Sequence, residues 1–99
     1  MLTPKELFDL RVEQFIAEIE NNIRRNWQGE KELHISQIKI DGVLFNVRFD
    51  DLLCVKVAEI FGMRNPGWLC EVKKEKRDVY TYQFFSISPK NNIETGIYR

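Results

Sequence analysis

The chain has 99 residues, of which 43% are apolar, 12% aromatic and 30% charged, enough for one hydrophobic core and too few for two domains. This apolar fraction excludes an intrinsically disordered chain. Fifteen basic and fifteen acidic side chains cancel, which excludes an overall electrostatic attraction to nucleic acid or to an anionic membrane. Residues 1–55 carry 7 basic and 10 acidic side chains and residues 56–99 carry 8 and 5. Halves of opposite sign favour self-association, so we expect a homodimer.

Two cysteines, Cys54 and Cys70, are too few for the disulfide framework of a small secreted domain, and neither has the spacing of zinc ligands. We expect both to be reduced and buried. No apolar run approaches the ~18 residues of a membrane span, and the first residues contain no apolar signal stretch. The sequence therefore predicts a cytoplasmic protein without a cofactor and without a membrane partner.

The first predicted element is a long helix. Thr3, Pro4 and Glu6 form a helix start, with an N-cap hydroxyl, a proline at the first helical position and a glutamate three residues after the cap. Apolar residues then recur at steps of three and four: Phe8, Val12, Phe15, Ile16, Ile19, Ile23 and Trp27. This spacing predicts about seven turns of helix that end near Gly29.

A period of two residues follows, which predicts a β-hairpin. Residues 34–40 alternate, with His34, Ser36, Ile38 and Ile40 on one face, and residues 43–49 alternate in the same way. Between them Asp41-Gly42 is suited to a type I′ turn. The expected register places Ile40 opposite Val43, Ile38 opposite Phe45, Ser36 opposite Val47 and His34 opposite Phe49.

A second helix and a second hairpin complete the predicted fold. Asp50 or Asp51 is expected to cap a helix of about three turns that ends at Gly62. Its apolar side consists of Leu53, Val57, Ile60 and Phe61. Turn residues occupy positions 64–67, and the alternating segments 68–72 and 79–85 predict strands joined by the charged run 73–78.

The order helix, hairpin, helix, hairpin predicts an α+β domain over residues 1–88. We expect one antiparallel sheet with both helices packed on one face. The composition becomes polar after residue 88, so residues 89–99 are expected to form a tail that is either loose or a short extra strand.

The charged run 73–78 and the nearby rings of Tyr80, Tyr82 and Phe84 leave two interpretations open. Cations that bind phosphate and rings that stack on bases are the parts of a nucleic-acid-binding surface. Alternatively, the run is a solvated turn whose charges protect the edge of the sheet. Glu75 and Asp78 dilute the positive charge, and lysines at the tip of a hairpin lie several residues beyond the rings. Both points favour the solvated turn.

Glu71-Val72-Lys73 has the E-x-K spacing of restriction-like nucleases, in which a strand presents a carboxylate to a divalent metal and a lysine to the scissile phosphate. Asp50 or Asp51 is then the candidate for a second metal ligand. In those nucleases the aspartate and the E-x-K usually lie on adjoining strands, whereas a predicted helix separates them here. Because E-x-K also arises by chance on half-exposed strands, a metal-dependent nuclease is the least favoured function. We assign no catalytic residue and no metal site.

The histidine and the tryptophans have structural and functional interpretations. His34 is the only histidine, which excludes a histidine metal cluster and favours a packed ring over a catalytic relay. Trp27 and Trp68 are expected to pin the long helix to the last hairpin, and an exposed anchor for a partner is the alternative.

The layout of the chain resembles a group of known proteins. A capped helix ending in I-E-N-N-I-R-R-N, a strand region, a short helix, the segment G-W-L-C-E-V and a Y-x-Y-x-F-F strand resemble small bacteriophage and prophage accessory proteins of about a hundred residues or fewer. The resemblance covers residues 3–87. It implies a phage-encoded, non-enzymatic protein, of a kind that includes inhibitors of host enzymes and defence complexes, and it assigns no site residue.

These observations predict a non-enzymatic module that binds a host or phage protein and modulates or inhibits it, in the host cytoplasm if the chain is phage-encoded. The aromatic residues outnumber what one small core requires, which favours a protein partner over the alternative, nucleic acid. The partner is expected to contact the edge and outer face of the sheet through Trp68, Lys74, Arg77, Tyr80, Tyr82 and Phe84.

Overall fold

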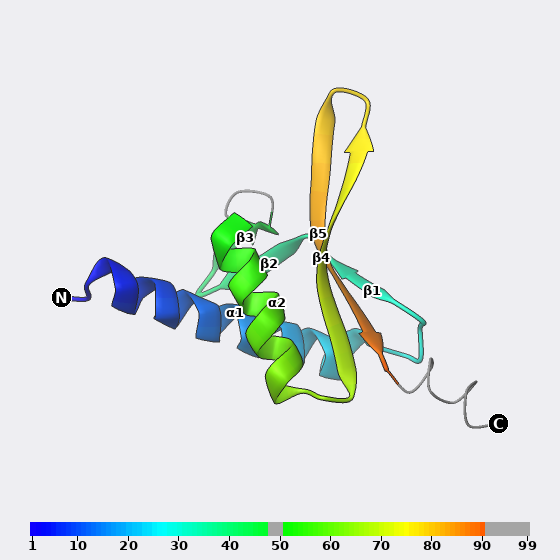
Figure 1. Ribbon diagram of the computed structural model, residues 1–99, viewed down its shortest axis with the longest axis horizontal. Coiled ribbons are helices and arrows are strands. Elements are labelled where there is room, and N and C mark those ends of the chain that lie inside the picture. Colours follow the sequence, from blue (N-terminus) through cyan, green and yellow to red (C-terminus); the bar gives the residue numbers. More distant parts are fainter. Residues whose placement is uncertain (48–50, 91–99) are drawn as a thin grey trace.

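The computed structural model describes residues 1–47 and 51–90, apart from the side chains of Asp51 and Arg77. A long helix is followed by three short strands, a second helix and two long strands (Figure 1). The predicted α+β class is therefore confirmed. Neither helix in the described part of the chain is long and apolar enough to cross a membrane.

Helix α1 spans Pro4–Asn26 and begins as the sequence predicts. The Glu6 N–H donates to Thr3 Oγ1 (3.1 Å) and the Thr3 N–H donates to Glu6 Oε1 (2.9 Å), so the two residues satisfy each other's backbone donors. The helix ends before the predicted Gly29, because Trp27 has an extended backbone with φ −74° and ψ 127°. Its buried side chains are Val12, Phe15, Ile16 and Ile19.

The predicted strand from His34 to Ile40 is divided at Ser36 into β1, Leu33–Ile35, and β2, Gln37–Ile40. Ile35 and Ile38 are both buried although they are three positions apart. Successive side chains of one continuous strand point to opposite faces, so such a strand cannot bury both on the same face. The break at Ser36 shifts the alternation by one residue and removes this conflict.

The face predicted for His34 is therefore wrong. His34 lies opposite Ser86 of the last strand, and its side chain is exposed rather than on the buried face of Ile38. Phe49, its predicted partner, lies outside the described residues.

The hairpin predicted around Asp41-Gly42 is confirmed. Strand β3, Val43–Asn46, pairs antiparallel with β2, and Ile40 lies opposite Val43 and Ile38 opposite Phe45. Asp41 and Gly42 have φ values of 50° and 81°, and a type I′ turn requires positive φ at both central positions. Beyond the strand ends, the Val47 N–H donates to the Ser36 carbonyl (3.0 Å).

Helix α2 spans Asp51–Arg64 and continues past Gly62, which we had expected to end it. It ends two residues before Pro66, because proline disfavours helical geometry in the residue before it. Arg64 makes a two-point contact with Glu13 of α1 (2.7 and 2.6 Å), which joins the end of α2 to the middle of α1. The fully described buried side chains of α2 are Leu53, Cys54, Val57 and Phe61.

The last hairpin is longer than predicted. Strands β4, Trp68–Arg77, and β5, Tyr80–Pro89, are joined only by Asp78 and Val79, so the charged residues 73–77 lie in a strand and not in a turn. Residues 73–77 contain no Gly, Pro, Asn or Asp. Asp78 is the first residue that tolerates a left-handed backbone, and its φ is 47°. β5 includes Pro89, the first residue of the predicted tail, and residues 91–99 lie outside the described residues.

The strands form two sheets instead of the single sheet that we expected. One has the order β1-β5-β4 and the other consists of β2 and β3. Figure 1 shows α2 lying across α1, while the tip of the β4–β5 hairpin projects beyond both helices. One core joins both helices with β1, β2, β4 and β5, and Phe45 of β3 packs against it; its residues are Val12, Phe15, Ile16, Ile19, Ile35, Ile38, Ile40, Val47, Leu53, Cys54, Val57, Phe61, Cys70, Phe85 and Ile87.

The Val47 carbonyl is a buried junction between elements. It accepts hydrogen bonds from Gln83 Nε2 of β5 (3.0 Å) and from Cys54 Sγ of α2 (3.1 Å). Gln83 is buried, and a buried amide is costly unless it is hydrogen-bonded. The junction therefore sets how the three-stranded sheet meets α2.

Phe61→Ala should lower the free energy of unfolding by about 3–5 kcal/mol, because the ring is 0% exposed and its loss leaves a cavity. Met63→Ala changes a side chain of the same helix that is 75% exposed, and should alter stability by less than about 0.5 kcal/mol. Urea denaturation followed by circular dichroism measures both variants. Equal effects of the two substitutions would contradict this assignment of the core.

Candidate functional site

The projecting half of the β4–β5 hairpin carries large exposed side chains. At its tip, Val79 is 97% exposed and Tyr80 is 48% exposed. From Gln83 to Ile87, β5 is buried. The hairpin thus has a rigid buried base and an exposed end that contains most of the predicted site residues.

The register divides the projecting hairpin into two faces, because residues directly opposite each other share a face. One, the aromatic face, carries Tyr82 opposite Glu75 and Phe84 opposite Lys73. Tyr80 belongs to the same face, since side chains alternate along β5. The second, the lysine face, carries Lys74 opposite Gln83 and Lys76 opposite Thr81. Rings and these two lysines therefore point to opposite sides of the sheet.

The predicted site residues separate into three groups. Tyr80, Tyr82 and Phe84 share the aromatic face, whereas Lys74 lies on the lysine face. Trp68 lies at the other end of β4. The backbone of Arg77 pairs with Tyr80, and its side chain lies outside the described residues.

Phe84 and Trp68 are already packed within the fold. Phe84 is 4% exposed, and its ring lies 4.4 Å from the His34 ring and 5.2 Å from the Tyr82 ring, centroid to centroid. The half-buried Trp68 packs edge-to-face on Trp27 at 5.2 Å and against the core. Trp68 therefore joins the hairpin to the end of α1, while Phe84 supports the half-buried ring of Tyr82.

Glu32 is the centre of a polar network on the aromatic face. Its carboxylate accepts hydrogen bonds from Lys73 Nζ (2.9 Å) and from the Ser86 hydroxyl, and it contacts His34 Nε2 (2.7 Å). The Ser86 hydrogen bond, followed by those of Lys73 and His34, lowers the pKa of Glu32 to about 2. The same carboxylate raises the pKa of Lys73. The network joins the chain before β1 to both strands of the hairpin.

Sequence reasoning missed Glu32 and Ser86 as members of any site. They are more than fifty positions apart in the chain, and no local pattern predicts that they meet. The sequence did contain a signal for the faces of the hairpin. If both strands extend to the first turn-forming residue, Asp78, Tyr80 and Tyr82 lie on one face and Lys74 and Lys76 on the other.

Glu71 and Lys73 of the E-x-K motif do not lie on the face of the sheet that packs against α2. Glu71 lies opposite Ser86 and Lys73 opposite Phe84, both on the aromatic face. Helix α2, which begins at Asp51, contributes to the core together with Cys70 and Phe85, whose side chains belong to the other face. No group of three or more His, Cys, Asp or Glu in residues 1–47 and 51–90 is placed to hold a metal ion.

The cysteines are buried and free, as the sequence predicts. Burial raises the pKa of the Cys70 thiol to about 12, so this group is protonated at neutral pH. The Cys54 thiol donates to the Val47 carbonyl. Both cysteines are therefore part of the packed core.

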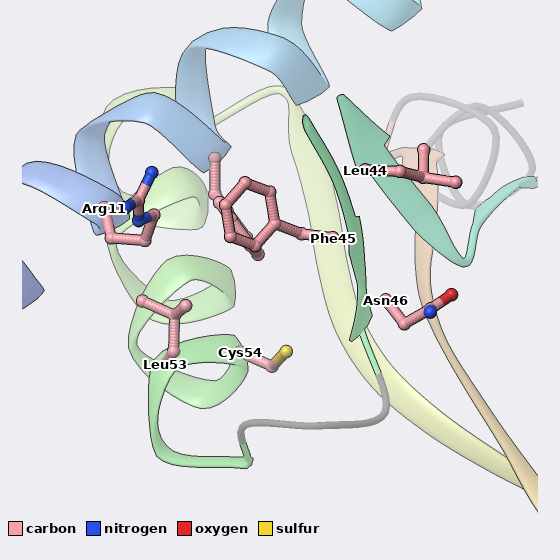
Figure 2. A pocket seen from close by; sticks show the side chains of 7 residues that line it. Arg11, Leu44, Phe45, Asn46, Leu53 and Cys54 are labelled. Atoms are coloured by element: carbon pink, nitrogen blue, oxygen red, sulfur yellow. The ribbon is translucent and has the colours of Figure 1, made fainter. Parts of the chain in front are cut away.

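A pocket of about 270 Å³ lies beside α1, α2 and β3. Figure 2 shows Arg11, Leu53 and Cys54 on the helices that border it and Phe45 on the strand. The Arg11 guanidinium lies 4.8 Å from the centroid of the Phe45 ring and donates to Gln14 Oε1 (2.9 Å). The one cation among the lining residues is thus already engaged, and the volume is below the ~300 Å³ at which small-molecule sites usually begin.

No protein-family model matches the chain, and the comparisons with curated proteins and with solved structures find no match either. Function is therefore inferred from the side chains and their geometry. Among the surfaces of the described residues, the aromatic face combines the exposed ring of Tyr80 and the half-buried ring of Tyr82 with the buried support of Phe84, and it is the candidate site.

Glu32→Gln should destabilise the protein at neutral pH by about 1 kcal/mol, a modest loss because the carboxylate is partly exposed and solvent screens its contacts. Folding lowers the pKa of Glu32 from its ordinary 4.5 to about 2. Its contribution is therefore complete well above pH 4.5 and is lost as the pH falls toward 2. Urea denaturation at several pH values should show wild type and variant converging over this range.

Glu71→Gln is the control for this pH dependence, since Glu71 lies on the same face but is not among the hydrogen-bond partners of the Glu32 carboxylate. Its stability curve should run parallel to that of the wild type. A gap between wild type and Glu32→Gln that stays constant down to the lowest pH would contradict the role of the ionised carboxylate.

Proposed function

We propose that the protein is a non-enzymatic binding module that holds a partner protein against the aromatic face of its projecting hairpin. The observation that carries this proposal is the position of Tyr80 and Tyr82 on one face of a strand pair that projects beyond the helices. Tyrosine offers a large contact area with little side-chain entropy to lose, and is enriched among the residues that dominate binding energy.

The hairpin is held ready for a partner before binding. Ten residues of β4 pair with ten of β5. Phe84 lies under Tyr82, and the Glu32 network ties Lys73 to the chain before β1. A surface that is already ordered loses less conformational entropy on binding than a flexible loop. This rigidity supports a recognition role.

The charges of the aromatic face indicate the chemistry of the partner. Glu71 lies on this face, and Lys73 is paired with Glu32. The Glu71 carboxylate and the tyrosine rings attract cationic side chains, through an ion pair at the rim and through cation–π contacts with the rings. We expect a partner surface that presents arginine or lysine.

Nucleic acid is the alternative partner, and the division of the hairpin into two faces disfavours it. A strand of nucleic acid that stacked on Tyr80 and Tyr82 would meet the carboxylates of Glu71 and Glu75, while Lys74 and Lys76 face the other way. Nucleic-acid binding predicts an affinity that falls steeply with salt concentration. Binding of oligonucleotides with that salt dependence would favour the alternative.

The wider context of the module remains a prediction from the sequence. The layout resembles phage and prophage accessory proteins, so we propose a host protein as the partner and inhibition or modulation by steric competition as the effect. We also propose that the module acts as a homodimer in the cytoplasm.

Tyr80→Ala should weaken partner binding at least about tenfold, as truncation of a central aromatic contact does. Lys76→Ala, on the opposite face of the same hairpin, should change binding less than about twofold and is the matched control. Affinity capture from host lysate with each tagged variant, followed by titration of the captured protein, measures both.

A protein that wild type and Lys76→Ala retain and Tyr80→Ala loses supports the proposal. Equal recovery with all three chains, or loss with Lys76→Ala alone, would contradict binding by the aromatic face. Circular dichroism of each variant confirms that the fold is intact.

A further inference from the structure

Helix α2 is apolar on its outer side as well as on the side that packs in the core. On the outer side Leu52 is 79% exposed, Val55 58% and Met63 75%. A surface helix of a monomeric protein usually turns charged and polar side chains to the solvent. Neighbouring large apolar side chains that stay exposed on one side of a helix indicate a contact surface.

Four exposed residues of α2 have the spacing of a coiled-coil seam. Leu52, Lys56, Glu59 and Met63 follow one another at steps of four, three and four residues, and all four are exposed. Residues at these steps lie along one line of a helix, where a second helix can pack. We call this line the α2 seam, and Val55 lies beside it.

The α2 seam is complementary to itself when its direction is reversed. Leu52 and Met63 lie at equal distances along the chain from the middle of the seam, and so do Lys56 and Glu59. In an antiparallel pair of α2 helices, Leu52 of each copy therefore lies opposite Met63 of the other, and Lys56 opposite Glu59. A parallel pair would instead place lysine opposite lysine and glutamate opposite glutamate, which is unfavourable.

We propose that the α2 seam is the contact surface for a second copy of the chain, with the two helices antiparallel about a two-fold axis at the middle of the seam. Within one chain Lys56 Nζ donates to Glu59 Oε1 (3.2 Å). The side chains of the pair are 47% and 57% exposed, so both can also reach the opposite charges of a second copy. The four charges then alternate in sign, and the apolar residues at both ends of the seam are buried.

This inference rests on the homodimer of the proposed function and names its surface. Helix α2 contributes to the core together with Cys70 and Phe85, which lie on the face of the sheet opposite to the aromatic face. The tip of the hairpin also projects beyond both helices (Figure 1). A dimer formed through the α2 seam therefore leaves two aromatic faces open, and a partner that presents its site twice is bound with greater avidity.

The seam is short, so the dimer should be weak. Contacts between small surfaces are typical of transient complexes, and we expect dissociation at micromolar concentrations or above. Unfolding of dilute protein then measures the monomer, because mass action removes the contribution of a weak dimer. Met63 can thus lie in the contact between copies and still contribute little to the stability of the single chain.

Two charge reversals test the pairing. Lys56→Glu brings a carboxylate opposite Glu59 of the second copy, and Glu59→Lys brings an ammonium group opposite Lys56. Each variant alone should dimerise with a dissociation constant at least about tenfold higher than that of the wild type. In an equimolar mixture of the two variants every carboxylate again meets an ammonium group. The mixture should therefore form a heterodimer with a dissociation constant within about threefold of the wild-type value.

Sedimentation equilibrium of the wild type, of each variant and of the mixture measures these constants. Lys31→Glu reverses the same charge at an exposed position outside α2 and is the matched control, which should dimerise as the wild type does. Circular dichroism confirms that each variant retains the fold. Lys56→Glu should also bind the protein captured through Tyr80, since the aromatic face is unchanged.

A dimeric wild type that neither reversal weakens would overturn the α2 seam as the contact and leave the homodimer itself standing. Two monomeric variants whose mixture also stays monomeric would overturn the antiparallel pairing. A wild type that sediments as a monomer at its highest soluble concentration would overturn both the seam and the homodimer, without affecting binding by the aromatic face. If such a monomer loses its captured protein in Lys56→Glu, the partner and not a second copy occupies the seam.

Discussion

Two isoleucines three residues apart, Ile35 and Ile38, set the constraint on which the architecture depends. Both are buried, and a single strand cannot bury both on the same face. The chain resolves the conflict at Ser36, where it leaves one sheet and enters another. This break ends β1 early, separates the small β2–β3 hairpin from the long one, and leaves the outer half of β5 without β1 beside it. The projecting hairpin exists because the first sheet stops where the alternation changes.

The long hairpin contains both a buried base and an exposed outer half in one pair of strands. Its base is part of the core, through Cys70, Phe85 and Ile87. In its outer half the alternation of the strands places Tyr80, Tyr82 and Phe84 on one face and Lys74 and Lys76 on the other. The net charge of the chain is zero, so composition alone does not reveal that charged and aromatic side chains are unevenly distributed over the two faces of the hairpin. The same division distinguishes a surface suited to another protein from one suited to a phosphate backbone.

Local signals in the sequence predicted the local structure well. The capping box at Thr3 and Glu6, the turn at Asp41-Gly42 and the register of β2 with β3 all depend on residues close together in the chain, and all are present. Pairing of β1 with β5 and the contact of Glu32 with Ser86 join distant segments, and no local pattern carries that information. The charged residues 73–77 were predicted to form a turn and lie in β4. Charged side chains indicate that a segment is exposed, and exposed strands carry them as often as loops do.

The pairing of β1 with β5 also orders the events of folding. The β4–β5 hairpin joins neighbouring segments, so little loop entropy opposes its closure, whereas Leu33 must wait for Ile87 from far along the chain. During synthesis β1 emerges first and stays without its strand partner until β5 has been made. Between the completion of β5 and the docking of β1, the edge of β5 at Phe85, Ser86 and Ile87 is uncovered. Neighbouring nascent chains can then meet along an edge that β1 covers in the native protein, and the speed with which β1 docks limits that encounter.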